Sequence, residues 1–177
     1  EKFIIPMNID LIKDFFASLK FTPTDSQKVA IFEILTDMEN DVPMSRLLEG
    51  DVGSGKTLVA TAVIANVIEH GGQCAFMVPT EVLAKQHTES IGKTLVGFHN
   101  YCQKEGISMP CPKVALLTGS VPKAQGEEIR ASIQTGNFDL IIGTHALIEG
   151  KVQFENLRLV IVDEQHRFGV AQRERLK

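Results

Sequence analysis

One short glycine-rich string limits the folds open to this chain more than any other feature. Residues 50–57 read Gly-Asp-Val-Gly-Ser-Gly-Lys-Thr and fit the pattern G-x-x-x-x-G-K-S/T. In that pattern the glycines let successive backbone amides point at one spot, and the helix that follows adds the positive end of its dipole. The string therefore predicts a strand, a phosphate-binding loop and a helix in that order, with a nucleoside triphosphate as the ligand.

Each part of this loop has an expected role. The Lys56 side chain is expected to reach the β- and γ-phosphates, and the Thr57 hydroxyl is expected to hold a Mg²⁺ that bridges them. The predicted nucleotide-binding residues of the loop are Gly50, Asp51, Val52, Gly53, Ser54, Gly55, Lys56 and Thr57. A surface turn that matches the pattern by accident is the alternative.

Composition narrows the class of protein. The chain has 177 residues, of which 44% are hydrophobic, enough for one domain to bury a continuous core without metal or disulfide staples. Three cysteines without a C-x-x-C pair favour neither a disulfide framework nor a zinc site, and Cys74 is expected in the core. With no run of eighteen apolar residues and no signal-peptide pattern at residues 1–6, we expect a cytoplasmic protein without a membrane partner.

From residue 46 onward, short apolar runs alternate with helical patterns. This alternation predicts an α/β fold of the P-loop NTPase type, with a doubly wound, mainly parallel sheet and helices on both faces. Amphipathic helices near 9–19 and 26–38 precede the first strand. The other expected elements are strands at 46–49, 73–78, 113–117, 139–142 and 158–162, and helices at 56–69, 81–95 and 122–134. The irregular stretch 96–112 is predicted to be an exposed loop or a short insertion.

We expect residues 1–177 to form one domain, with a helical lead-in over 1–40 and a P-loop core over 45–177. The chain stops inside a helical pattern at 170–177, which suggests a fragment of a larger protein. The net charge is −4, so any nucleic acid would have to be contacted by local amides, helix N-termini and a few side chains rather than by a basic surface.

Two acids form the predicted second half of the nucleotide site. Asp163 and Glu164 directly follow the apolar run 159–162, so they are expected at the same sheet edge as the phosphate loop. Asp163 is predicted to anchor Mg²⁺ opposite Thr57, and Glu164 to orient and deprotonate a water for attack on the γ-phosphate. Two solvated acids ending a strand are the alternative. By chemistry alone, His166 is a packing histidine rather than a relay, and Gln27 belongs to an N-terminal helix cap.

Several strings together resemble the first motor domain of superfamily 2 DNA helicases, which has a RecA-like fold. They are Thr24-Asp25-Ser26-Gln27, residues 50–57, Pro79-Thr80-Glu81 with Leu83-Ala84 and Gln86-His87, Thr118-Gly119-Ser120, Gly143-Thr144-His145 and residues 163–166. The longer strings at 50–57 and 163–169 look specifically like the RecG-type family of ATP-dependent helicases, which remodel branched DNA.

The resemblance implies particular roles. ATP is the expected nucleotide, Gln27 reads the adenine edge, and His166 couples the ATP site to DNA, joining Lys56, Asp163 and Glu164 in the catalytic set. The implied DNA-contacting residues are Pro79, Thr80, Glu81, Gly119, Ser120, Gly143, Thr144 and His145. Further implied partners are DNA forks or junctions, a second motor domain that supplies an arginine finger, and a branch-reading wedge domain. Without those domains we expect the chain to be nearly inactive as a hydrolase.

Two other interpretations stay open. The motor of a transcription-repair coupling translocase shares the phosphate loop and the acid motif, although that family tends to have an aromatic residue in place of Ser54 and a glutamate in place of Gln165. A small-molecule kinase or nucleotide-gated binding module would also use a phosphate loop, but no arginine-rich lid is evident between Lys56 and Leu140. A structural protein with a vestigial loop would gain no thermal stability from nucleotide.

Overall fold

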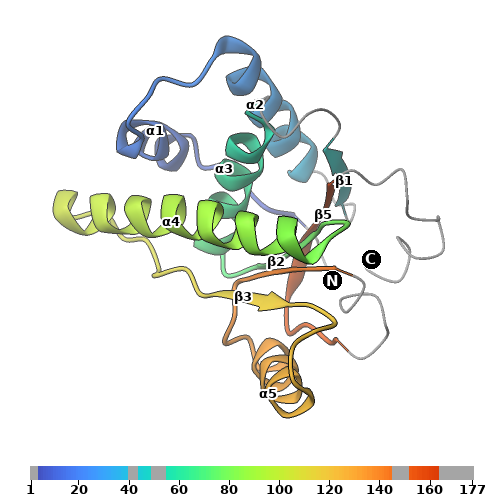
Figure 1. Ribbon diagram of the computed structural model, residues 1–177. Coiled ribbons are helices and arrows are strands. Elements are labelled where there is room, and N and C mark those ends of the chain that lie inside the picture. The colour runs from blue at the N-terminus through green and yellow to red at the C-terminus, as the bar shows by residue number, and fades with distance from the viewer. Residues whose placement is uncertain (1–3, 40–43, 49–54, 145–151, 164–177) are drawn as a thin grey trace.

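The computed structural model describes residues 4–39, 44–48, 55–144 and 152–163, which contain a parallel sheet covered by helices (Figure 1). The sheet has five strands in the order β1-β5-β2-β4-β3, and all neighbouring pairs are parallel. The strands are β1 (Met44–Leu48), β2 (Gln73–Met77), β3 (Val114–Leu117), β4 (Leu140–Gly143) and β5 (Leu157–Asp163). The prediction of a parallel α/β fold is confirmed, with strand limits within two residues of those expected.

Helices cover both faces of this sheet. They are α1 (Ile9–Ser18), α2 (Asp25–Met38), α3 (Lys56–Glu69), α4 (Glu81–Glu105) and α5 (Lys123–Gln134). In Figure 1, α1 to α4 gather on one side of the sheet, and α5 lies on the other. Among the helices described, none is long and apolar enough to cross a membrane.

Strand β2 shows why the apolar runs are continuous rather than alternating. All five of its residues are buried, because successive side chains point to opposite faces and each face is covered. Cys74 and Phe76 pack in the core beneath α3 and α4, whereas Ala75 and Met77 pack in the core that includes Ile133 of α5. Cys74 is fully buried, as predicted, and this burial raises the pKa of its thiol.

The segment before α1 is attached to the rest of the domain by hydrogen bonds. Ile5 N donates to Met38 O at 2.9 Å, at the end of α2. The buried amide of Asn66, on α3, accepts from Asn8 N at 3.1 Å and donates through Nδ2 to Pro6 O at 3.1 Å. The predicted helical lead-in is therefore packed on α3, not separate from it.

The prediction of a loop or insertion over 96–112 is wrong for its first part, because α4 continues to Glu105. Gly97 and Asn100 suggested a break, but Leu95, Phe98 and Cys102 continue the buried stripe at helical spacing. Phe98 packs edge-on against Phe15 of α1, with ring centroids 5.4 Å apart. Tertiary packing on α1 thus outweighs the low helix propensity of Gly97. The helix ends at Gly106, whose φ of 72° is left-handed.

Candidate nucleotide site

The strand order brings the two halves of the predicted site to one edge of the sheet. Leu48, the last residue of β1, is the Cα partner of Asp163, the last residue of β5. Helix α3 begins at Lys56, so seven residues, 49–55, connect it to the end of β1. The ends of β1 and β5 therefore lie side by side, and the placement of loop residues 50–54, which lie outside the described residues, stays a prediction.

The start of α3 has the properties of an anion site. Its N-cap is Gly55, with a left-handed φ of 79°, and glycine has no side chain that could accept from the first amides of the helix. Every residue of α3 from 58 to 68 is buried, which fixes the direction of the helix and its dipole. Lys56 and Thr57, in the first turn, are half-buried. The positive end of the α3 dipole therefore lies at Gly55, within the string that predicts phosphate binding.

Gln27, in the first turn of α2, forms hydrogen bonds with both Thr24 and Gly55. Its Oε1 accepts from Thr24 N at 2.7 Å while its own N–H donates to Thr24 Oγ1 at 3.2 Å, which completes the predicted capping box. Its Nε2 also donates to Gly55 O at 3.3 Å, across to the last residue before α3. A Cβ added to Gly55 would collide with that same Nε2. The amide of Gln27 is thereby held beside the predicted phosphate loop.

Asp163 has a neighbour that sequence reasoning missed. His87, on α4, places Nε2 3.3 Å from Asp163 Oδ2, and the two side chains are 6% and 13% exposed. The imidazole also packs against the Phe76 ring, with centroids 5.1 Å apart. The available signal was the spacing of Ala84, His87 and Ile91 along one buried face of α4. That pattern predicts a buried histidine, but not its partner.

The donor set fits a magnesium ion held partly by phosphate. Within the described ranges, no group of three or more His, Cys, Asp or Glu could hold a metal by itself. Mg²⁺ usually keeps several waters and binds one or two protein oxygens together with substrate phosphates. The Thr57 hydroxyl and the Asp163 carboxylate are oxygen donors of this kind.

The described members of the predicted DNA-contacting set lie at the same carboxyl edge, at or just after the ends of β2, β3 and β4. Met77 and Leu117 are both Cα partners of Gly143, so the segments that follow these strands start side by side. Thr80 caps α4 by accepting from Leu83 N at 3.2 Å. Thr144 is buried, whereas Gly119 is exposed and Pro79 half-buried.

Glu81 links two of these segments. Its carboxylate accepts from Ser120 N at 3.0 Å and from Ser120 Oγ at 2.9 Å. The hydrogen bond from the Ser120 side chain is the main reason that the pKa of Glu81 lies below its ordinary value, with the Ser120 backbone, Thr118 and Lys85 also contributing. The start of α4 is thus tied to the turn after β3.

Part of the predicted site falls outside the described residues: Gly50, Asp51, Val52, Gly53, Ser54, His145, Glu164 and His166. Their roles stay predictions.

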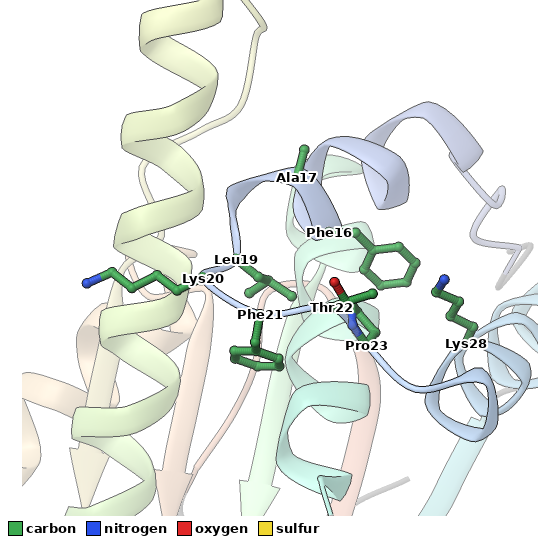
Figure 2. A pocket seen from close by; sticks show the side chains of 8 residues that line it. All are labelled: Phe16, Ala17, Leu19, Lys20, Phe21, Thr22, Pro23 and Lys28. Carbon is green, nitrogen blue, oxygen red and sulfur yellow. The ribbon is translucent and has the colours of Figure 1, made fainter.

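A hollow of about 340 Å³ lies at the connection between α1 and α2 (Figure 2). It is lined by Phe16, Ala17, Leu19, Lys20, Phe21, Thr22, Pro23 and Lys28. Phe21 is 58% exposed, and Lys28 is the sequence neighbour of Gln27. Sequence reasoning did not predict this hollow, because it forms where the chain turns between two helices.

Comparison with known proteins gives a consistent result. The DEAD/DEAH box helicase model matches residues 24–177. The ATP-dependent DNA helicase RecG of Thermotoga maritima is 47% identical over 174 residues, which cover 97% of this chain and 21% of that protein. RecG of Staphylococcus epidermidis is 46% identical over 177 residues, covering all of this chain and 24% of the relative.

Comparison with solved structures gives the same family as comparison with sequences. The structure of RecG bound to a three-way DNA junction matches with a TM-score of 0.72 and 44% identity, over 94% of this chain and 21% of that one. The UvsW helicase of bacteriophage T4, at 17% identity and a TM-score of 0.61, shares the fold. The chain spans about a fifth of the length of the RecG relatives described above.

Proposed function

The chain belongs to the DEAD/DEAH box helicase family, and we propose that it is the ATP-binding motor domain of a RecG-like DNA helicase. In the full-length protein, ATP hydrolysis drives translocation on branched DNA. The observation that carries the proposal is the pairing of Leu48 with Asp163, which supports a shared site for the phosphate loop and the acid.

The nucleotide is held at the start of α3. The first amides of that helix and the Lys56 ammonium bind the phosphates, and Thr57 and Asp163 would hold a Mg²⁺ that neutralises charge as the γ-phosphoryl leaves. Glu164 orients and deprotonates the attacking water. His166 couples the ATP site to DNA. The left-handed Gly55 and the buried helix behind it support the phosphate-binding role.

The adenine is read by Gln27. Its amide already lies beside the loop through the bond to Gly55 O. The hollow in Figure 2 reaches Lys28, and the exposed ring of Phe21 offers a flat apolar face beside which a base can pack. ATP rather than another nucleotide is the substrate under this proposal.

DNA is contacted along the edge beyond β2, β3 and β4, by Pro79, Thr80, Gly119, Ser120, Gly143, Thr144 and His145. The net charge of −4 favours contacts from amides and hydroxyls over bulk attraction. Glu81 belongs to this surface as a brace: its carboxylate would repel phosphate, and it already accepts two hydrogen bonds from Ser120.

The proposal also covers the DNA partners, the further domains of the full-length protein and its location in the cell. Forks and three-way junctions are the DNA partners, in line with the junction-bound RecG structure. A second motor domain supplies an arginine finger, which is worth roughly 10³–10⁵ in rate in comparable systems. A wedge domain reads the branch, the location is cytoplasmic, and no membrane is involved.

The test compares residues 1–177 with the full-length protein. Residues 1–177 should bind fluorescent Mg-ADP and hydrolyse almost no ATP with or without DNA. The full-length protein should hydrolyse ATP faster with forked DNA than with duplex or single-stranded DNA of the same length. If residues 1–177 did not bind Mg-ADP, or if they unwound DNA on their own, the proposal would be refuted. If ATP hydrolysis by the full-length protein did not depend on forks, a different translocase would be favoured.

A further inference from the structure

The side chain of His87 is polar and buried, and the proposed function assigns it no role. Its ring nitrogen Nε2 has no hydrogen-bond partner among the described residues, although Asp163 Oδ2 lies 3.3 Å away. The pair is close enough for an ion pair but is not aligned as a hydrogen bond. Buried ring nitrogens without a partner are uncommon in folded proteins, so this one calls for a physical explanation.

The surroundings limit how His87 and Asp163 can move. The imidazole packs against Phe76 in the middle of the sheet, and it projects from a helix whose neighbouring buried residues, Ala84 and Ile91, fix its rotation. Asp163 is the last residue of β5, which lies between β1 and β2 in the sheet, and its side chain is only 13% exposed. A small rotation of the carboxylate or the ring is enough to align Nε2–H with Oδ2. Such bonds are often loose without ligand and tighten when the ligand binds.

We propose that His87 is a positioning residue for Asp163, a role that rests on the proposed function. When nucleotide and Mg²⁺ bind, Nε2–H of His87 donates to Oδ2 of Asp163 and fixes the orientation of the carboxylate. Partners that orient a metal-binding carboxylate in this way typically change metal affinity or activity 10- to 100-fold when they are removed.

The position of His87 on α4 gives this contact a second consequence. Thr80 and Glu81, at the start of the same helix, belong to the proposed DNA surface, and His87 lies two turns further, about 10 Å along the axis. Because α4 is a single helix from Glu81 to Glu105, a displacement of its first turn by DNA moves His87 as well. His87 therefore links the DNA surface to the acid that holds Mg²⁺.

The experiment uses the full-length protein with three variants. His87→Phe keeps the ring packing on Phe76 and removes Nε2–H, whereas His87→Gln keeps a donor. His99→Phe is the control, because His99 is half-buried on the same helix and bonds through Nδ1 to Met109 O. It lies about 18 Å further along α4 than His87 and on another face of the helix. The primary readout is the Mg²⁺ concentration that gives half of the maximal ADP-induced rise in melting temperature. The second readout is the stimulation of ATP hydrolysis by forked DNA.

His87→Phe should raise the half-saturating Mg²⁺ concentration about tenfold or more and should lower DNA stimulation, with ADP affinity in EDTA unchanged. His87→Gln should recover most of the Mg²⁺ response, and His99→Phe should behave like the wild type. An unchanged Mg²⁺ requirement in His87→Phe would overturn the inference, even if the variant were less stable. If the wild type itself failed to bind Mg-ADP, the proposed function would fail first.

If His87→Phe does not fold, the wild type still decides the question. In a protein labelled with ¹⁵N-histidine, Mg-ADP should slow the solvent exchange of the His87 Nε2 proton, assigned by comparison with His87→Gln. An exchange rate unaffected by Mg-ADP would overturn the inference.

Discussion

The first turns of α3 and α4 lie at the same edge of the sheet but are built in opposite ways. Helix α4 is complete in itself: Thr80 accepts from Leu83 N, and the acidic Glu81 lies at the positive end of the dipole. Helix α3 starts at a glycine, with no acid in its first turn and with Lys56 as its first residue. A lysine at that end of a helix is unfavourable unless an anion is present.

This difference indicates which helix start needs a ligand. The amides at the start of α4 are partly satisfied by the protein, so this turn is complete without a ligand. The start of α3 has a lysine, no acid in its first turn and no side-chain hydrogen bond at its cap, which together favour a polyanion. Helix α5 also has no side-chain cap bond, because its N-cap is Pro122, but its first turn lacks a phosphate-loop sequence.

Lys56→Ala is the strongest test of the conclusion that the start of α3, and not the start of α4, binds phosphate. Loss of one charged hydrogen-bonding group should weaken the binding of Mg-ADP by roughly 10- to 100-fold. Fluorescence titration of a labelled nucleotide measures the change. Lys93→Ala, an exposed lysine on α4, is the matched control and should leave affinity unchanged. Equal behaviour of the two variants would show that the start of α3 is not where phosphate binds.

Gly55→Ala should have the next largest effect. A left-handed φ costs an alanine about 1–2 kcal/mol, and its Cβ would collide with Gln27 Nε2. Urea denaturation should therefore show a loss of stability of that size or larger, together with weaker nucleotide binding.

The control for Gly55→Ala is Gly106→Ala, at the end of α4. Gly106 has φ 72°, close to the 79° of Gly55, but an added Cβ there meets nothing within 4 Å. This variant should show the backbone cost alone and bind nucleotide normally. If both variants bound nucleotide equally well, the contact of Gln27 with Gly55 would have no part in the site.

Thr80→Ala tests the start of α4, which is expected to serve stability and not nucleotide binding. Removal of the side-chain acceptor at the N-cap should destabilise the chain by about 1 kcal/mol. ADP affinity in EDTA should not change, because the cap serves α4 and not α3, and the proposed link through His87 acts only on the Mg²⁺ site. Thr80→Ser keeps an acceptor and should retain most of the stability in urea denaturation. A loss of ADP affinity in EDTA in Thr80→Ala would show that the start of α4 contributes directly to the phosphate site.

Glu81→Gln should have the smallest effect, and one that depends on pH. The hydrogen bond from Ser120 lowers the pKa of Glu81 in the folded chain below its ordinary value of 4.5. The ionised carboxylate therefore stabilises the fold at every pH above 4.5. That contribution is lost as the pH falls through the lower, folded pKa. Melting temperatures of the wild type and variant should differ at pH 7 and converge once the pH is below the folded pKa of Glu81. A difference that persisted in strong acid would exclude this origin.

Local pattern was enough to predict most of the elements. Buried runs such as 159–162 and the glycines of the loop act over a few residues, so the sequence contains them directly. The same local reasoning failed at Gly97, where the packing of Phe98 on Phe15 keeps the helix intact. A helix breaker is a weak local preference, and a buried aromatic contact between distant segments can exceed it.

The sequence by itself determined a strand, a glycine-rich string and a helix, followed much later by a strand that ends at Asp163. The tertiary structure decided which groups face one another: Gln27 with Gly55, Glu81 with Ser120, and His87 with Asp163. Those pairs depend on the strand order β1-β5-β2-β4-β3, which places residues far apart in the chain at one edge. Strand order follows from how whole faces of helices and sheet pack together, and no local pattern contains it.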